Sequence, residues 1–197
     1  MDKPRTFVFF GIVGSGKGTQ VELLQKYLQE KDSSAEFMLA SPGVGYRKLI
    51  SEGYYTGQIV KTSLEKGYLQ PNFLTIGLVT NNFAFSMKEN STIIADGFPR
   101  TIEQSEALEK ILAYYGRTEV HIMYIELSKE EAIKRMKLRG RSDDTDEGIA
   151  KRFDEYVNNV IPSMNYFKGK SGYTIHTING DQSIEAVHAD IIKSLSL

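Results

Sequence analysis

A glycine-rich segment near the N-terminus carries the clearest chemical signal in this sequence. Residues 11–19 read Gly-Ile-Val-Gly-Ser-Gly-Lys-Gly-Thr and directly follow an apolar run. Glycines let several backbone N–H groups turn toward one anion, and a helix that begins at the end of such a loop adds positive potential. The lysine, Lys17, can reach the β- and γ-phosphates of a nucleotide. The segment is therefore predicted to be a phosphate-binding loop between a strand and a helix.

Two other interpretations of this segment are weaker. Gly14, Ser15 and Gly16 also resemble half of a dinucleotide-binding fingerprint, but Thr19 stands where that fingerprint needs its third glycine. Lys17 would have no role in such a site. The other alternative is a glycine-rich turn without function, yet the full pattern of spaced glycines, lysine and threonine rarely arises by chance.

Oxygen ligands for a metal ion are sparse around this loop. The residue after Lys17 is Gly18 rather than the serine or threonine that commonly holds Mg²⁺, and Thr19 comes one step later. We therefore expect no direct metal ligand from the loop, and expect Asp96, at the end of an apolar run, to hold Mg²⁺ through water. No zinc is expected, because the sequence has no cysteine and its histidines lack the spacing of metal ligands.

Arginines form the second group of candidate residues. Arg135 and Arg139 are four residues apart, so they share one face of a predicted helix and can point at a single ligand. A guanidinium group can donate two parallel hydrogen bonds to phosphate oxygens, and it stays positively charged. Such groups can stabilise the negative charge that spreads over a transferring phosphoryl group. Further cations follow at Arg141 and Arg152. The alternative is a surface network of ion pairs with nearby acidic residues: Asp143, Asp144, Asp146 and Glu147.

Three further motifs make the sequence resemble the adenylate kinase family. They are Gly97-Phe-Pro-Arg-Thr101, Arg139-Gly-Arg-Ser-Asp-Asp144 and Lys151-Arg152. With the phosphate-binding loop they extend the resemblance over nearly the whole chain. It implies reversible phosphoryl transfer between ATP and AMP, giving two ADP, with Mg²⁺ as the cofactor that accompanies ATP.

The resemblance implies a role for each matching residue. Catalysis would depend on Lys17, Arg100, Arg139, Arg141 and Arg152. ATP would contact Gly14, Ser15, Gly16, Lys17, Gly18, Thr19, Arg135 and Arg139. AMP would contact Ser41, Gly43, Arg47, Leu69, Gln70, Gly97, Arg100, Gln104, Arg141 and Arg152. Leu69 and Gln70 would act through backbone carbonyls, and the Gln104 amide offers the paired donor and acceptor that an adenine edge requires.

One departure from the family leaves the acceptor open. Where the family usually has Thr-Gly-Asp before its acceptor-site arginine, this chain has Pro42-Gly-Val44. A hydroxyl and a carboxylate are therefore absent, and the fixed backbone angle of Pro42 is expected to stiffen the loop. The alternatives to an adenylate kinase are a pyrimidine (UMP or CMP) kinase, a regulator that binds nucleotides without catalysis, and another ATPase or GTPase that acts on water.

The elements that must position these residues alternate along the chain. Apolar, β-branched runs predict strands at 6–11, 37–40, 92–96, 120–127 and 173–178. Apolar residues at helical spacing predict helices at 17–30, 44–53, 56–66, 72–88, 101–115, 128–139, 146–168 and 183–195. This alternation is typical of an α/β fold, with helices on both faces of a five-stranded parallel sheet.

The predicted organisation is a single phosphate-binding-loop kinase domain over residues 1–197. Its core would comprise 1–40, 71–139 and 146–197, with a small helical acceptor-binding insertion at 41–70 and a minimal lid at 140–145. The net charge of −1 argues against nucleic acid as a partner. No apolar run reaches the roughly 20 residues that span a membrane, and no signal peptide is recognisable. We therefore expect a cytoplasmic monomer whose partners are ATP, AMP and ADP.

Overall fold

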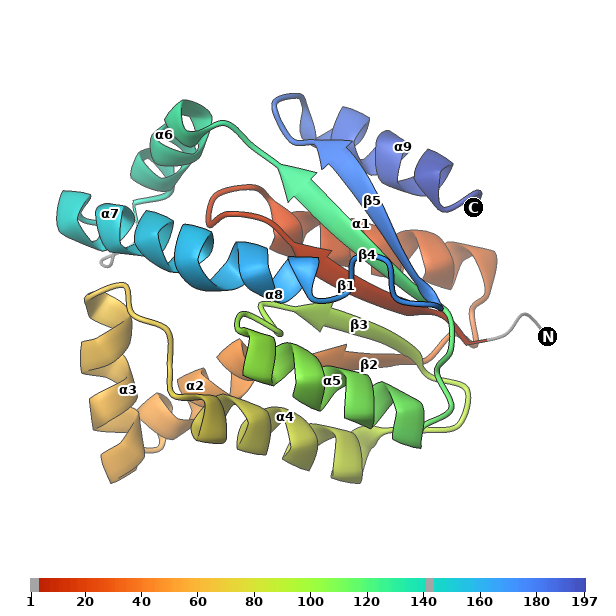
Figure 1. Cartoon of the computed structure of the whole chain (residues 1–197), viewed down its shortest axis with the longest axis horizontal. Helices are drawn as coiled ribbons and strands as arrows, with labels where there is room; N and C mark the ends of the chain where they lie inside the picture. Colours follow the sequence, from red (N-terminus) through yellow and green to blue (C-terminus); the bar gives the residue numbers. More distant parts are fainter. Residues whose placement is uncertain (1–3, 141–143) are drawn as a thin grey trace.

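The computed structural model describes residues 4–140 and 144–197. Its centre is one sheet of five parallel strands in the order β2-β3-β1-β4-β5 (Figure 1). The strands are β1 (Thr6–Phe10), β2 (Phe37–Ala40), β3 (Thr92–Asp96), β4 (Val120–Glu126) and β5 (Tyr173–Asn179). The predicted α/β fold with a five-stranded parallel sheet is confirmed.

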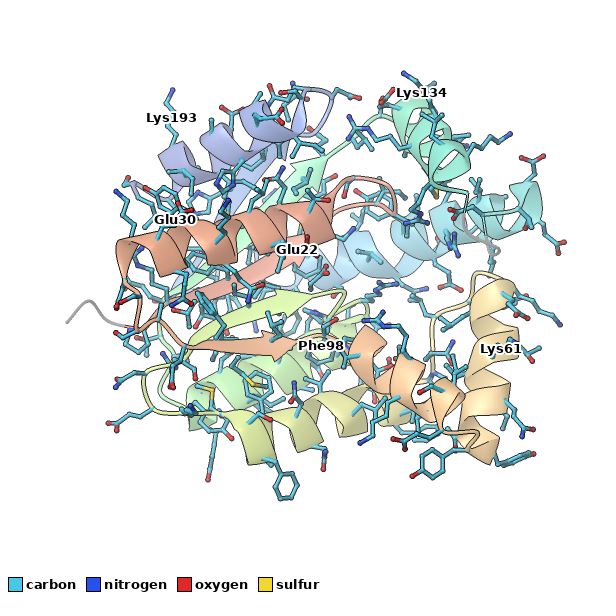
Figure 2. All side chains as sticks on the ribbon, turned by 180° about the vertical axis from the view of Figure 1, so that it is seen from behind. Glu22, Glu30, Lys61, Phe98, Lys134 and Lys193 are labelled. Atoms are coloured by element: carbon cyan, nitrogen blue, oxygen red, sulfur yellow. The ribbon has the colours of Figure 1, made fainter. Side chains whose placement is uncertain are left out.

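Helices cover both faces of this sheet. In Figure 1, α4, α5 and α8 lie on the near face, while α1 and α9 lie on the far face and come to the front in Figure 2. The helices are α1 (Lys17–Lys31), α2 (Pro42–Ser51), α3 (Tyr55–Glu65), α4 (Asn72–Ser86), α5 (Ile102–Tyr114), α6 (Lys129–Arg139), α7 (Asp146–Glu155), α8 (Ile161–Asn165) and α9 (Ile184–Ser194).

Two apolar clusters hold the layers together. One packs Phe10, Phe98 and Phe167 between the sheet and α4, α5 and α8. The other packs Phe7 and Leu24 between the sheet and the pair α1 and α9. Every residue of β1 is buried, which is the pattern of a parallel strand covered on both faces.

The chain changes direction at β1, and this places the site. From β1 the chain first builds β2 and β3 on one side, then crosses to β4 and β5 on the other. In such sheets the crevice at the carboxyl ends of the strands, where the order reverses, is the usual ligand-binding place. The strand arrows in Figure 1 point toward this edge, where α2, α3, α6 and α7 gather.

Two predicted helices differ from the structure in detail. The helix expected at 44–53 begins at Pro42, which occupies its first turn rather than a loop, because the fixed angle of proline suits that position. The helix expected at 146–168 is divided into α7, a π-helical turn η1 (Tyr156–Val160) and α8. A π-helical turn contains a wider hydrogen-bonded ring and often lies at functional sites.

Three tyrosines of the described chain are largely exposed. Tyr54, Tyr55 and Tyr114 have exposed fractions of 54%, 77% and 83%. Tyr115 is half-buried and stacks on Phe83 with ring centroids 5.8 Å apart. Within residues 4–140 and 144–197, no helix has the length and apolarity to cross a bilayer, and no three acidic or histidine side chains cluster to hold a metal.

Candidate active site

A cavity of about 730 Å³ opens at the carboxyl edge of the sheet. Its wall is made by the phosphate-binding loop, the start of α1, the 41–70 segment, the end of β3, and the helices that carry the predicted arginines. The predicted residues that line it are Gly14, Gly16, Lys17, Gly18, Thr19, Ser41, Gly43, Arg47, Leu69, Gln70, Asp96, Gly97, Arg100, Gln104, Arg135, Arg139 and Arg152. Ser15 is buried and is not among the residues that line the cavity. Arg141 lies outside the described residues.

The phosphate-binding loop adopts a backbone that only glycine tolerates. Gly14 and Gly16 have φ angles of +91° and +86°. Gly11 has φ +149°, and a Cβ there would lie 2.6 Å from the carbonyl oxygen of Ile125. Gly16 is also the N-cap of α1 and brings no side chain to its first N–H groups. The start of α1 is therefore free to bind an anion through its backbone.

The ammonium of Lys17 lies inside the curve of this loop. Its Nζ donates to the carbonyl oxygens of Gly11 at 2.7 Å and Ile12 at 2.9 Å. Burial lowers the pKa of Lys17 to about 8; attraction to Asp96 opposes this shift and repulsion from nearby arginines adds to it. A buried cation that lacks a counter-charge of equal strength is a strong attractor for phosphate.

Asp96 comes to the same place from the neighbouring strand. It pairs with Phe9 in the ladder between β1 and β3, so its carboxylate leaves the sheet beside the loop. A Cβ added to Gly18 would lie 4.0 Å from Asp96 Oδ2. The small residue after Lys17 thus leaves space next to the carboxylate. Such an arrangement suits a hydrated cation better than a direct side-chain ligand from the loop.

Arg100 is fixed at the floor of the cavity by the turn after β3. Its Nε donates to the carbonyl oxygen of Gly97 at 2.9 Å, and Gly97 has a φ of +72°. A Cβ on Gly97 would lie 3.0 Å from Arg100 Nη2, so the glycine also makes room for the guanidinium. Burial lowers the pKa of Arg100 and attraction to Asp96 opposes it, but an arginine stays charged under all ordinary conditions.

The amide of Gln104 is oriented by two hydrogen bonds. Its Oε1 accepts from the backbone N–H of Arg100 at 2.8 Å, and its Nε2 donates to Asn72 Oδ1 at 2.8 Å. The hydroxyl of Thr101 also donates to Asn72 Oδ1. One N–H and one lone pair of Gln104 are left to contact a ligand. Sequence reasoning missed Asn72, because nothing in the pattern links it to a glutamine 32 residues away.

Asp144 holds two of the predicted catalytic arginines. Its Oδ1 accepts from Arg139 Nη2 at 2.7 Å and from Arg152 Nη1 at 2.6 Å, while its Oδ2 accepts from Arg139 Nε. The Asp144 side chain is only 2% exposed. Burial raises its pKa, but the two guanidiniums outweigh this and hold the pKa below its usual value.

Part of the ion-pair network considered as an alternative is therefore present, since Asp144 pairs with Arg139 and Arg152. Both arginines nevertheless line the cavity. Asp146 pairs with Lys137 at 2.9 Å rather than with an arginine of the cavity. Arg135 is held by Glu131 at 2.9 Å and by the carbonyl oxygen of Gly180 at 3.0 Å. Asp143, like Arg141, lies outside the described residues.

Further residues line the cavity that the sequence did not single out for it. The hydroxyls of Tyr46 and Thr75 lie 2.6 Å apart at the end near α2 and α4. Tyr156, the first residue of η1, bonds through its hydroxyl to Tyr124 at 2.8 Å. Burial and the contact with Tyr124 raise the pKa of Tyr156, so it stays neutral. Aromatic residues are too common in cores for sequence alone to assign these positions.

The segment that follows α3 contacts α7. The ammonium of Lys151 lies 4.7 Å from the ring centroid of Tyr68, a cation–π contact. Next to it Gly67, with φ +78°, approaches the backbone so closely that a Cβ would lie 2.7 Å from the carbonyl oxygen of Gly148. The wall formed by this segment is therefore packed directly against the helix that carries Arg152.

Comparison with known proteins gives this cavity its context. A sequence model of the family described as Adenylate kinase matches residues 9–172. The chain belongs to the adenylate kinase family. An adenylate kinase of Bacteroides thetaiotaomicron is 35% identical over 193 residues, covering 95% of this chain and 96% of that protein. One of Prochlorococcus marinus strain AS9601 is 32% identical over 189 residues, covering 96% and 97%.

A third relative shows that the similarity extends across several bacteria. An adenylate kinase of Porphyromonas gingivalis strain ATCC 33277 is 33% identical over 185 residues, covering 91% of this chain and 90% of that protein. The resemblance noted from the motifs is thus confirmed. Described residues from the phosphate-binding loop and from each of the three further motifs line this one cavity.

Replacing Asp144 by asparagine is expected to destabilise this family member and slow it. The substitution removes a buried ion-pair partner from both Arg139 and Arg152, so we expect a loss of about 3 kcal/mol in unfolding free energy at pH 7. The loosened guanidiniums should lower kcat about tenfold or more. Because the folded pKa is depressed, the stabilisation is present above about pH 4 and is lost as pH falls through the folded pKa.

Urea unfolding at pH 7 and pH 3 checks this expectation. The difference between Asp144→Asn and the unchanged protein should be large at pH 7 and shrink at pH 3. Asp146→Asn is the matched control, since that carboxylate is 87% exposed and its pair with Lys137 should matter by less than about 1 kcal/mol. Equal stability of Asp144→Asn and the unchanged protein at pH 7 would contradict the stabilising role given to the ion pairs of Asp144.

Proposed function

We propose that this protein is an adenylate kinase that catalyses ATP + AMP ⇌ 2 ADP. The observation that carries the proposal is that a single cavity holds both the phosphate-binding loop and arginines from four separate helices or turns. A nucleotide hydrolase needs one nucleotide site and a water. Cations on both sides of Lys17 instead suit two nucleotides whose phosphate chains meet end to end.

ATP is assigned to the half of the cavity nearest α1 and α6. The loop glycines, Lys17 and Thr19 would bind its phosphates, and the start of α1 adds positive potential. Arg135 would lie against its base, since its guanidinium plane is fixed by Glu131 and the Gly180 carbonyl. The minimal lid predicted at 140–145 includes residues 141–143, which lie outside the described residues.

AMP is assigned to the half built by the 41–70 segment and the end of β3. Arg47 and Arg100 would bind its phosphate, and Gln104 would use its remaining N–H and lone pair on the adenine edge. Ser41, Gly43, Leu69 and Gly97 would contribute backbone contacts. On this assignment the helices α2 and α3 form the acceptor-binding insertion.

Mg²⁺ fits the site through Asp96. The carboxylate stands beside the space left by Gly18, and Mg²⁺ keeps most of its waters when it binds proteins. When bound, Mg²⁺ would supply positive charge against the negative charge of the phosphates. Asp96 would hold and orient its hydration shell.

The residues of the chain supply charge and position rather than a base. Lys17 and Arg100 would hold the two phosphate chains in line. Arg139 and Arg152, clamped by Asp144, would face the equatorial oxygens of the phosphoryl group as it moves. Since all these groups come from one chain, we also propose that the enzyme works as a monomer, and we place it in the cytoplasm with its substrates.

Disproportionation of ADP tests the proposed function. ADP mixed with Mg²⁺ and the protein should yield ATP and AMP, which phosphorus NMR resolves. With ATP as donor, AMP should exceed CMP, UMP and GMP as acceptor by at least about tenfold in kcat/KM. A preference for UMP or CMP would indicate a pyrimidine kinase, as the replacement of Thr-Gly-Asp by Pro42-Gly-Val44 leaves open. Release of phosphate from ATP without products from ADP would indicate a hydrolase.

A further inference from the structure

The side-chain nitrogen of Gln70, Nε2, has no hydrogen-bond partner in the part of the chain that the structure describes. Gln70 is 6% exposed, and its Nε2 contacts no acceptor among residues 4–140 and 144–197. A buried N–H group without a partner is costly, and proteins leave few of them. Gln70 also lines the cavity, at the end of the 41–70 segment. The unpartnered donor therefore stands at the edge of the half assigned to the acceptor nucleotide.

Neighbouring polar groups around Gln70 are engaged with one another. The Thr75 hydroxyl lies 3.1 Å from the Pro71 carbonyl oxygen and 3.5 Å from that of Gln70. The same hydroxyl lies 2.6 Å from that of Tyr46. These contacts fix the backbone of Gln70 against α4, and none of them uses its side-chain Nε2. Because Gln70 lines the cavity, a molecule that enters the cavity can supply a partner for this donor.

Gln104, the other glutamine in the half assigned to the acceptor, has few hydrogen-bonding groups left for a ligand. Gln104 spends one N–H on Asn72 and one lone pair on the backbone of Arg100. What remains can satisfy the amino group and one ring nitrogen along a single adenine edge. Adenine carries acceptor nitrogens on other edges as well. A second amide would add recognition of one of those nitrogens, and this could offset the polar contacts absent at Pro42 and Val44.

We propose that Gln70 is a further specificity-determining residue, whose Nε2–H donates a hydrogen bond to a ring nitrogen of the acceptor purine. The inference rests on the proposed function and deepens it. It assigns the Gln70 side chain a contact with the base, beyond the backbone contact inferred from the family resemblance. The site then discriminates by leaving a buried donor unpaired when a base without an acceptor at that place binds.

The test combines Gln70→Leu with AMP analogues that lack one ring nitrogen each. KM and kcat are measured for AMP and for its 1-deaza, 3-deaza and 7-deaza forms, with ATP as donor. Gln70→Leu should raise KM for AMP about tenfold. It should leave KM unchanged for the one analogue that lacks the bonded nitrogen. KM for ATP should not change.

Two controls separate recognition from folding. Gln58→Leu changes an exposed glutamine of α3 that does not line the cavity, and it should leave both KM values unchanged. Removing an unpartnered buried donor should not lower the melting temperature, so Gln70→Leu is expected to melt no earlier than the unchanged protein. Calorimetric binding of AMP should weaken by the same factor as KM.

The inference is overturned if Gln70→Leu binds AMP normally, or if it loses equal affinity for AMP and for all three analogues. The second result would mean that the side chain only packs. These results are distinct from a failure of the proposed function, which would appear as an unchanged protein that does not disproportionate ADP.

Discussion

Lys17→Met should lower kcat by a factor of about a thousand or more while the fold stays intact. Lys17 is the cation within the loop, and its ammonium would stabilise the negative charge that develops on the phosphates in the transition state. Methionine matches its length and removes that charge. The effect should fall on kcat and kcat/KM together, since the interaction matters most in the transition state. Single-turnover formation of ADP from ATP and AMP measures it.

The same substitution is expected to make the protein more stable at neutral pH. The pKa of Lys17 is about 8 in the folded protein, against about 10.5 when unfolded, so folding penalises the charged form. That penalty, up to about 3 kcal/mol, is fully present below pH 8 and is relieved as pH rises toward 10.5. Lys17→Met should therefore melt several degrees higher at pH 7, with a smaller gain at pH 10.

Lys61→Met is a matched control for both effects. Lys61 lies on α3 and points away from the molecule in Figure 2, outside the residues that line the cavity. Its loss should change neither kcat nor melting temperature appreciably. Turnover of Lys17→Met within tenfold of the unchanged protein would contradict the role given to Lys17. A lower melting temperature at pH 7 would contradict the pKa argument.

Arg152→Met is the second substitution with a large expected effect. Its side chain is 10% exposed and lines the cavity, and its guanidinium is held by Asp144. Arginines at a transferring phosphoryl group contribute about 10³-fold or more to turnover, and methionine keeps only the packing of the stem. We expect kcat to fall by about that factor, with KM for AMP and ATP changing much less. Steady-state kinetics with each substrate varied in turn measure the split.

A cation of the same region provides the comparison for Arg152. Lys137 is 56% exposed and pairs with Asp146 outside the cavity, so Lys137→Met should leave kcat nearly unchanged. A loss of kcat of equal size in both variants would show that general charge, rather than the placed guanidinium, supports the reaction. Unfolding curves should confirm that Arg152→Met remains folded.

Features that depend on residues close together in the sequence could be predicted. The phosphate-binding loop, the apolar strand before it and the position of Asp96 at a strand end all follow from residues within a few places of each other. Parallel strands end at one edge, so Lys17 and Asp96 had to meet. The common location of Arg100, Arg139 and Arg152 was predicted only from the family motifs, because no spacing in the sequence links these residues.

Other parts depend on contacts between distant residues and could not be predicted. The Asn72–Gln104 bond joins two helices, and the missing partner of Gln70 becomes visible only when its whole environment is known. Asp144 was anticipated as a partner of the arginines, but its place between two of them was not. The π-helical turn η1 has no sequence signature, since its residues suit an α-helix equally well.

Binding of a ligand that joins two adenosines through five phosphates tests the central claim most directly. If Lys17 and the arginines meet over two nucleotides placed end to end, calorimetry should show one ligand per chain and complete loss of both ATP and AMP binding in its presence. Lys17→Met and Arg100→Ala should each weaken that binding. Two independent ligands per chain, or AMP binding that persists when the ligand is bound, would contradict the account.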